Sequence, residues 1–230
     1  RAIFTRVYGD DYFRTLQTLQ YEANIDYWED NSRAAVPKIR ELIARVEQRT
    51  NIDPLFLSEL HRDLGMAEHE LKHHDICLAE LAKAIELARS TGAAGVRDVA
   101  MLQVQDGQFK ADEKLEYGID ELREAYETLR RLKDPRAGYA LAAYAVTYFS
   151  HKRYKEALPL FELALAEDAI KDLTPYNLAI LRFTLAQTLH QLKKEPARVR
   201  ELATQAHADY IRSHYEKPAK IVADFIKKLR

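Results

Sequence analysis

Four alanines recur along this 230-residue chain at intervals of about forty residues. They lie in similar helical contexts, 41, 39 and 42 residues apart, at Ala84, Ala125, Ala164 and Ala206. Self-similarity at this period is typical of stacked helix pairs, because each pair has an apolar face that only a neighbouring pair can bury. The period therefore predicts an all-α solenoid. Arrays of this kind present an extended surface, so we expect a binding module.

Prolines mark the same period. Pro54, Pro135 and Pro175 each follow a residue able to cap a helix, and they lie 81 and 40 residues apart. Proline is tolerated at the first position of a helix, because its missing N–H has no helical partner there. Five of the seven prolines fall at expected helix starts, at positions 54, 135, 175, 196 and 218. Pro37 and Pro159 fall inside expected helices, where we expect a late start or a kink.

Apolar residues recur at helical spacing, and strand patterns are nearly absent. We expect a single domain, 1–230, of five antiparallel helix pairs followed by a capping helix at 218–229. The repeats span about 11–48, 54–91, 96–131, 135–168 and 175–212. Their helices are expected at 11–28 and 33–48, 54–72 and 76–91, 96–111 and 115–131, 135–151 and 155–168, and 175–192 and 196–212. Gly92 lies where a helix should end.

Composition argues against several classes of protein. The formal net charge is −1, so no overall field favours nucleic acid or an anionic membrane, and we expect neither as a partner. No apolar run approaches the roughly 18 residues of a membrane span. The single cysteine excludes an intrachain disulfide and fits a reducing, cytoplasmic compartment. The chain begins with Arg1 rather than Met, so an attached domain or a signal peptide could precede it.

Residues 141–164 resemble a tetratricopeptide repeat (TPR). That family places large, small and aromatic residues at fixed offsets over two helices, and the matching residues here are Leu141, Tyr144, Ala145, Tyr148, Tyr154, Ala157, Phe161 and Ala164. The match is partial at 61–84 and 102–125 and weak at 19–42 and 185–206. The period exceeds the family's usual 34 residues and resembles long variants in bacterial signalling proteins and peptide-sensing regulators. The resemblance implies a right-handed superhelix of helix pairs, an α-solenoid.

One short motif suggests catalysis. His69-Glu70-Leu71-Lys72-His73 is H-E-x-x-H, which in zinc peptidases places two histidines on one helical face with a general base between them. Lys72 would place a positive charge beside the metal, and no third ligand follows at the spacing of the longer motif. We therefore predict a solvated helix end, with no metal, no cofactor and no enzymatic activity. A zinc-dependent hydrolase is the remote alternative.

In the TPR family the first helix of each pair lines a concave groove, which implies a docking surface for a protein or peptide. The groove residues selected by matching slots are Asn24, Tyr27, Arg62, Met66, Tyr139, Val146, Phe149, Phe183, Gln187 and His190. The groove is thus expected to be polar in its N-terminal half and aromatic in its C-terminal half. Aromatic side chains are common interface anchors. The alternative is that Tyr139, Phe149 and Phe183 pack between repeats.

These features predict a non-catalytic scaffold or adaptor that acts in a signalling or assembly context and binds a protein or peptide in its groove. A peptide-sensing regulatory domain is the alternative. It ranks second because a ladder of asparagines would hold an extended peptide backbone, and only Asn24 is present. The family's carboxylate clamp is not reproduced, because Asn24 has no basic partner one turn earlier. The last helix is basic and amphipathic, and we expect it to cap the array rather than bind a membrane.

Overall fold

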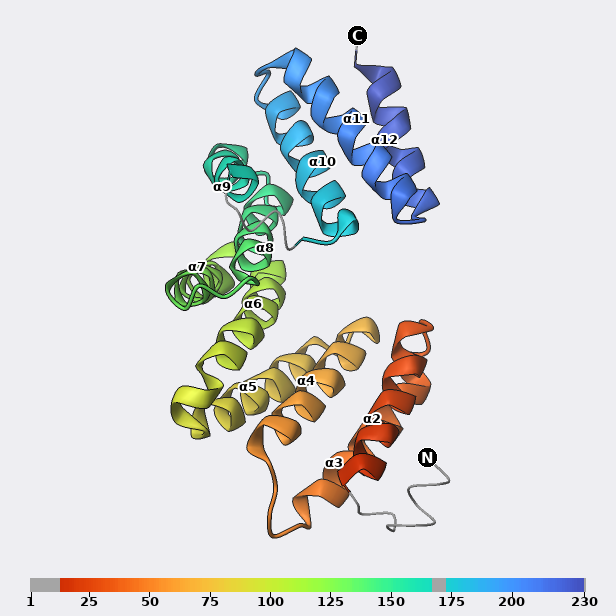
Figure 1. Ribbon diagram of the computed structural model, residues 1–230, viewed down its shortest axis with the longest axis vertical. Helices are drawn as coiled ribbons and strands as arrows, with labels where there is room; N and C mark the ends of the chain where they lie inside the picture. Colours follow the sequence, from red (N-terminus) through yellow and green to blue (C-terminus); the bar gives the residue numbers. More distant parts are fainter. Residues whose placement is uncertain (1–12, 167–172, 230) are drawn as a thin grey trace. The chain divides into compact units, whose positions relative to one another are not determined.

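The computed structural model describes residues 13–166 and 173–229, and every regular element in these ranges is a helix (Figure 1). The α-helices are α2 (Phe13–Trp28), α3 (Ser32–Glu47), α4 (Pro54–Glu70), α5 (His74–Ser90), α6 (Val96–Glu113), α7 (Leu115–Arg131), α8 (Ala137–Ser150), α9 (Tyr154–Ala166), α10 (Pro175–Gln191), α11 (Pro196–Arg212) and α12 (Glu216–Lys228). A 3₁₀ turn, η1 (Gly92–Gly95), joins α5 to α6. The all-α prediction is confirmed for this part of the chain. The expected helix residues 11, 12, 167 and 168 lie outside it.

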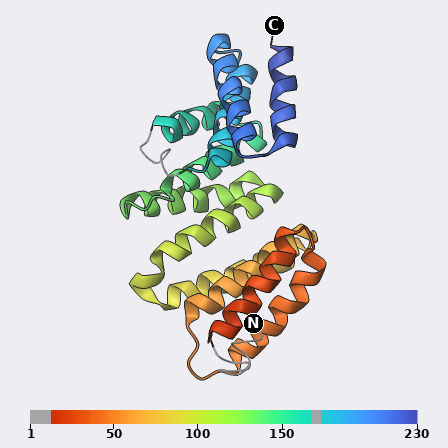
Figure 2. The ribbon, with the colours of Figure 1, turned by 45° about the vertical axis from the view of Figure 1, so that its right-hand side comes forward.

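The chain divides within α6 into two compact units, one up to Phe109 and one from Lys110 onward. In the first unit α3 packs against both α2 and α4, and α4 packs against α5 (Figure 2). In the second unit α8 packs against α7, α9 and α10, while α11 packs against α10 and α12. Successive helices are therefore neighbours in space, as in helical hairpins. The predicted pairing of 96–111 with 115–131 spans the boundary between the units. It stays a prediction, as does the single domain.

The periodic alanines lie at close helix contacts. Ala84, Ala125, Ala164 and Ala206 are all buried, with exposed fractions of 0–1%. The residue three positions before each alanine is fully buried as well, and these residues are Leu81, Leu122, Phe161 and Ala203. A small side chain allows the helices to approach, and the larger side chains fill the remaining space. Gly65 shows how close α4 and α5 come, since a Cβ added there would lie 3.2 Å from the carbonyl oxygen of Cys77.

Six helices in the described part of the chain end in the same type of turn. The left-handed residue of each turn is Asp30, Lys72, Lys133, Lys152, Lys193 or His214, with φ between 52° and 67°. The N–H of the next residue then donates to a carbonyl five positions earlier, as from His73 to Glu68 at 3.0 Å and from Arg153 to Tyr148 at 2.9 Å. This Schellman geometry satisfies carbonyls at the helix end and reverses the chain for the next helix. Gly92, with φ 63°, follows α5 as predicted.

Three of the five predicted proline starts are confirmed, at Pro54, Pro175 and Pro196. Pro135 instead lies in the turn before α8, which starts at Ala137. The cause is Asp134, whose Oδ1 accepts a hydrogen bond from the backbone N–H of Arg136 at 2.9 Å and closes a turn around the proline. Pro218 lies in the first turn of α12, which starts two residues earlier.

A late start or a kink was expected at Pro37 and Pro159, and the late start is wrong at both. Helices α3 and α9 both begin five residues before their proline and continue past it. Each proline leaves one carbonyl without its helical N–H donor, that of Arg33 or Lys155. All four of these residues are exposed, so water can bind the two carbonyls. An internal proline therefore costs less on these outer helix faces than the sequence pattern suggests.

Candidate functional site

In the first unit, predicted groove residues of α2 and α4 meet at one buried carboxylate. Asp63 of α4 is only 9% exposed. Its Oδ2 accepts hydrogen bonds from Gln20 Nε2 at 2.9 Å and Asn24 Nδ2 at 3.1 Å, both on α2. Its Oδ1 accepts two bonds from the Arg62 guanidinium, at 2.8 and 3.2 Å. The structure thus brings Asn24 and Arg62 together around an acid that the sequence prediction did not select.

This arrangement fixes the orientation of the Asn24 amide. Its NH₂ group points to Asp63, so its Oδ1 is left as an acceptor, and the described residues supply no hydrogen bond to that oxygen. Gln20 lies one turn earlier on the same face of α2 and is held by the same carboxylate. Gln20 is buried and therefore serves to hold the cluster, so the half-buried Asn24 is the amide that can offer an acceptor to a ligand.

Acidic groups dominate the electrostatics around this cluster. Burial raises the pKa of Glu59, and the nearby Asp63 and Asp98 act in the same direction, while Arg62 opposes them. Burial also raises the pKa of Tyr27, helped by Glu70, Asp63 and Asp30. Tyr27 and Met66 are half-buried on the two helices. The surface around the Asp63 cluster therefore combines amides, carboxylates and the Arg62 guanidinium.

The H-E-x-x-H motif does not form a helical metal site. Helix α4 was expected to reach residue 72 but ends at Glu70, because Lys72 adopts a left-handed conformation, and His73 precedes α5. The His69 ring stacks on Phe109, with ring centroids 3.9 Å apart, whereas His73 Nδ1 lies 2.6 Å from Glu68 Oε2. The two imidazoles therefore have different surroundings. Within residues 13–166 and 173–229, no cluster of three or more His, Cys, Asp or Glu could hold a metal ion.

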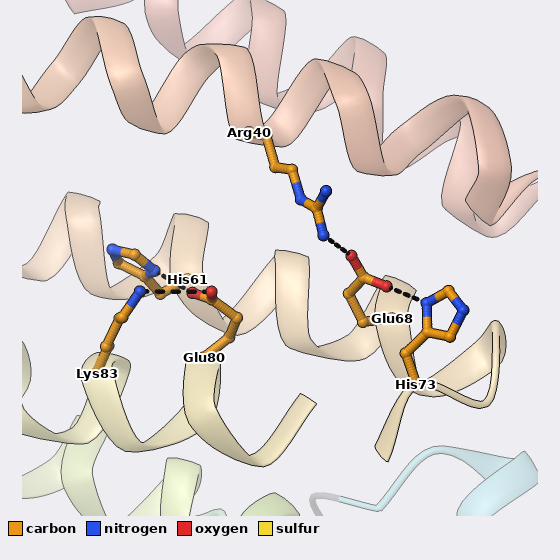
Figure 3. A network of polar contacts seen from close by, with 6 residues as sticks. All are labelled: Arg40, His61, Glu68, His73, Glu80 and Lys83. Atoms are coloured by element: carbon orange, nitrogen blue, oxygen red, sulfur yellow. Dashed lines mark hydrogen bonds and ion pairs between the residues drawn. The ribbon is translucent and has the colours of Figure 1, made fainter. Parts of the chain in front are cut away.

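Glu68 is the buried centre of a polar network that joins α3, α4 and the turn before α5 (Figure 3). It is 1% exposed and contacts Arg40 Nη2 of α3 at 2.5 Å as well as His73. Beside it, His61 Nδ1 of α4 lies 2.6 Å from Glu80 Oε2 of α5, and Lys83 lies 3.5 Å from the other oxygen of Glu80. The hydrogen bond to His61 is the main cause of the lowered pKa of Glu80. Buried charges of this kind need such partners, so the network is structural.

In the second unit, α8 carries the predicted aromatic positions. Tyr139, Val146 and Phe149 are all half-buried. The Phe149 ring contacts Tyr154 at the start of α9, with centroids 5.6 Å apart. Burial raises the pKa of Tyr139. Each of the three side chains therefore keeps some surface open.

On α10, two predicted groove residues contact the last helix. Phe183 and His190 both meet Phe225 of α12 edge-on, with centroids 5.4 Å apart in each case. Gln187 lies between them and is half-buried. Helix α12 packs on α11 through Ala219 and Val222, which are buried, so it caps the last pair as predicted. The Phe183 contact is packing between neighbouring helices, which the sequence left open as the alternative to ligand binding.

Comparisons with known proteins identify the type of fold. No protein-family model and no curated protein matches the chain. One similar solved structure is a Signal Transduction ATPase with Numerous Domains (STAND) from Pyrococcus horikoshii, which has a tetratricopeptide repeat sensor. The aligned region covers 94% of this chain and 32% of the STAND chain, with 16% sequence identity and a TM-score of 0.73. A second is Bacillus thuringiensis PlcR in complex with the peptide PapR7 and DNA. The aligned region covers 96% of this chain and 78% of the PlcR chain, with 15% sequence identity and a TM-score of 0.68.

The Rap conjugation gene regulator of the plasmid pLS20, in complex with the Phr* peptide, matches 93% of this chain over 64% of its own. Its identity is 15% and its TM-score 0.67. Likenesses at this level of identity show the fold alone. The chain has a TPR-type helical repeat fold, as the sequence resemblance predicted. None of the helices in its described part has the length and apolar character needed to cross a membrane.

Proposed function

We propose that this chain is a non-catalytic interaction module that binds a peptide segment of a partner protein on the first-helix faces of its repeats, in a signalling or assembly context. The observation that carries the proposal is the Asp63 cluster, in which a buried carboxylate fixes the amides of Gln20 and Asn24. An extended peptide presents backbone N–H groups, and the fixed, half-buried Asn24 amide has an Oδ1 that can accept from one of them. The second unit presents a surface of its own, where the half-buried aromatic residues of α8 can supply apolar contacts of the kind that anchor interfaces.

A peptide-sensing regulatory domain is the second candidate. It is favoured by the likeness to PlcR with PapR7 and to the Rap regulator with Phr*, both solved with a peptide. The two candidates share the binding surface and differ in what binding does. A sensor changes the protection of many backbone amides when the peptide binds, whereas a scaffold changes only those at the contact. Hydrogen exchange with and without a bound peptide separates them.

The test uses peptides selected on the purified chain from a random display library, with affinity measured by fluorescence anisotropy. We expect Asn24→Ala to weaken about tenfold or more the binding of peptides held by the first unit, and Phe149→Ala that of peptides held by the second, because a lost hydrogen bond or aromatic anchor costs about 1–2 kcal/mol. The prediction of no nucleic-acid partner is checked in the same assay with duplex DNA.

The matched control is Gln48→Ala, an amide exposed at the end of α3. Lys155→Glu on α9 serves as a control for charge. Both should bind normally, and circular dichroism should show unchanged helicity in all variants. Normal binding by both Asn24→Ala and Phe149→Ala would exclude these surfaces as the docking site.

A further inference from the structure

The C-terminal end of α10 borders a cavity whose charged lining is cationic. The cavity has a volume of about 760 Å³ and lies between the α10–α11 turn, the start of α11 and the end of α12. Its lining includes His190, Lys193, Lys194, Arg200 and Lys228. None of the described residues that line it is acidic. In a chain with a net charge of −1, this is a strong local excess of positive charge.

The charges of this cavity are poorly neutralised by the protein itself. Glu195 is the nearest acid in sequence, but its carboxylate lies 3.2 Å from Arg198, which also binds Glu162 at 2.6 Å. Arg200 donates to the backbone carbonyl of Leu229 rather than to a carboxylate. Within the described part of the chain, no ion pair involves the three lysines of the lining. The electrostatic repulsion among these three lysines falls when an anionic group enters the cavity.

The cavity continues the predicted binding face of α10. Phe183, Gln187 and His190 follow one another at helical spacing and share one face of the helix. His190 itself lines the cavity, so this face ends there. Two further residues of the lining, Lys193 and Lys194, lie in the left-handed turn that follows α10. Val199 and Leu229 add apolar surface to the lining.

We propose that this cavity binds the carboxylate side chains of an acidic peptide segment, with the rest of the peptide lying along His190 and Gln187 of α10. The inference rests on the proposed function, because it specifies the chemistry of the peptide held on α10. A volume of about 760 Å³ is in the range of small-ligand sites and exceeds the needs of a single small anion. The methylene groups of Glu side chains match the apolar part of the lining, and their carboxylates match its lysines.

The test titrates the ¹⁵N-labelled full chain with an octapeptide of alternating Ala and Glu, and follows the backbone amides by NMR. Shifts are expected at residues 190–200 and 227–229. The matched octapeptide with Gln in place of Glu should leave these amides unchanged. Raising the salt concentration from about 50 mM to about 500 mM should weaken the binding of the acidic peptide at least about tenfold, because salt screens exposed charges.

The decisive variant combines Lys194→Glu with Lys228→Glu, and we expect it to lose at least about tenfold in affinity. Its matched control combines Lys217→Glu with Lys220→Glu, which makes the same change of charge at exposed positions of α12 outside the cavity. The control should bind within about threefold of the original chain. Equal losses in both double variants, or equal binding of the two octapeptides, would overturn the proposal.

Inorganic phosphate is titrated separately. If phosphate alone produces the same shifts and displaces the peptide at similar concentration, the cavity is a small-anion site and the peptide proposal is wrong. If library-selected peptides depend on Phe149 and Asn24 but not on Lys194 and Lys228, the proposed function stands and this inference fails. If the acidic peptide depends on the two lysines while no peptide depends on Phe149 or Asn24, the cavity stands and the proposed function fails.

Discussion

At the scale of single residues, buried carboxylates hold helices together and were the hardest feature to predict. Asp63, Glu68 and Asp209 are buried, and each contacts an arginine. Each has a near partner in sequence, Arg62, His73 or Arg212, but the partners that join it to another helix lie 27 to 43 residues away. An acidic residue on the apolar face of a helix, such as Asp63 between Leu60 and Leu64, is the only local signal. Burial of a charge requires a partner, but the sequence does not say which one.

Glu80 gives a prediction about pH. Its lowered pKa means that its charged form stabilises the folded chain. This contribution is fully present above its ordinary pKa of 4.5 and is lost as the pH falls through the lowered value. Glu80→Gln should therefore melt about 3 °C lower than the original chain near neutral pH. The two melting temperatures should converge as the pH falls from neutral through 4.5 and below.

The raised pKa of Glu59 has the opposite effect on stability, but Glu59 is present in both chains and cancels in the difference. Thermal unfolding followed by circular dichroism is the measurement. A difference in melting temperature that stays constant over this range of pH would show that Glu80 does not act through its charge.

Lys152 gives a prediction about backbone strain. Its φ of 59° costs a residue with a Cβ about 1–2 kcal/mol, and glycine removes this cost while losing about 0.5–1 kcal/mol of chain entropy. Lys152→Gly should therefore stabilise the chain by about 0.5–1 kcal/mol. Glu124→Gly, at an exposed position within α7, should destabilise it by about 1 kcal/mol. Urea unfolding measures both, and destabilisation by Lys152→Gly would refute the strain argument.

At the scale of elements, the existence of the helices was predictable and their ends were less so. The apolar spacing and the proline and glycine signals give each described helix to within a few residues. The error at the end of α4 arose because Lys72, not glycine, takes the left-handed position, and this matters since it separates His69 from His73. Lysine carries no sequence signal for that conformation. The tertiary packing of the next helix stabilises it instead.

Ala157 tests the packing of the second-unit helices. It is fully buried in α9, which packs against α8. Ala157→Leu adds volume where no space is available and should destabilise the chain by about 1–3 kcal/mol. Ala208→Leu, at an exposed position of α11, should change stability by less than about 0.5 kcal/mol. Equal stability of the two variants would mean that α8 and α9 are packed differently.

At the scale of the whole molecule, the period of about forty residues predicted an all-α solenoid, and the resemblance of residues 141–164 predicted the TPR-type fold. The candidate site was only partly predictable. Slot matching selected Asn24 and Arg62, which do meet in space, but it missed the acid that they share. It also selected Phe183 without its contact to Phe225, because the position of α12 depends on packing between distant segments. A repeat pattern specifies which face of a helix is presented and leaves the neighbours of that face undetermined.

The left-handed lysines have a consequence for proteolysis. Trypsin cleaves after lysine and needs an extended stretch of backbone, but at Lys72, Lys133, Lys152 and Lys193 the N–H of the scissile bond is hydrogen-bonded inside a closed turn. Each of these bonds is therefore protected until its turn opens. The rate of cleavage at each lysine then reports how often the two helices joined there separate. The chain thus contains four natural reporters of local unfolding, at the α4–α5, α7–α8, α8–α9 and α10–α11 junctions, and mass spectrometry of the fragments can follow them together.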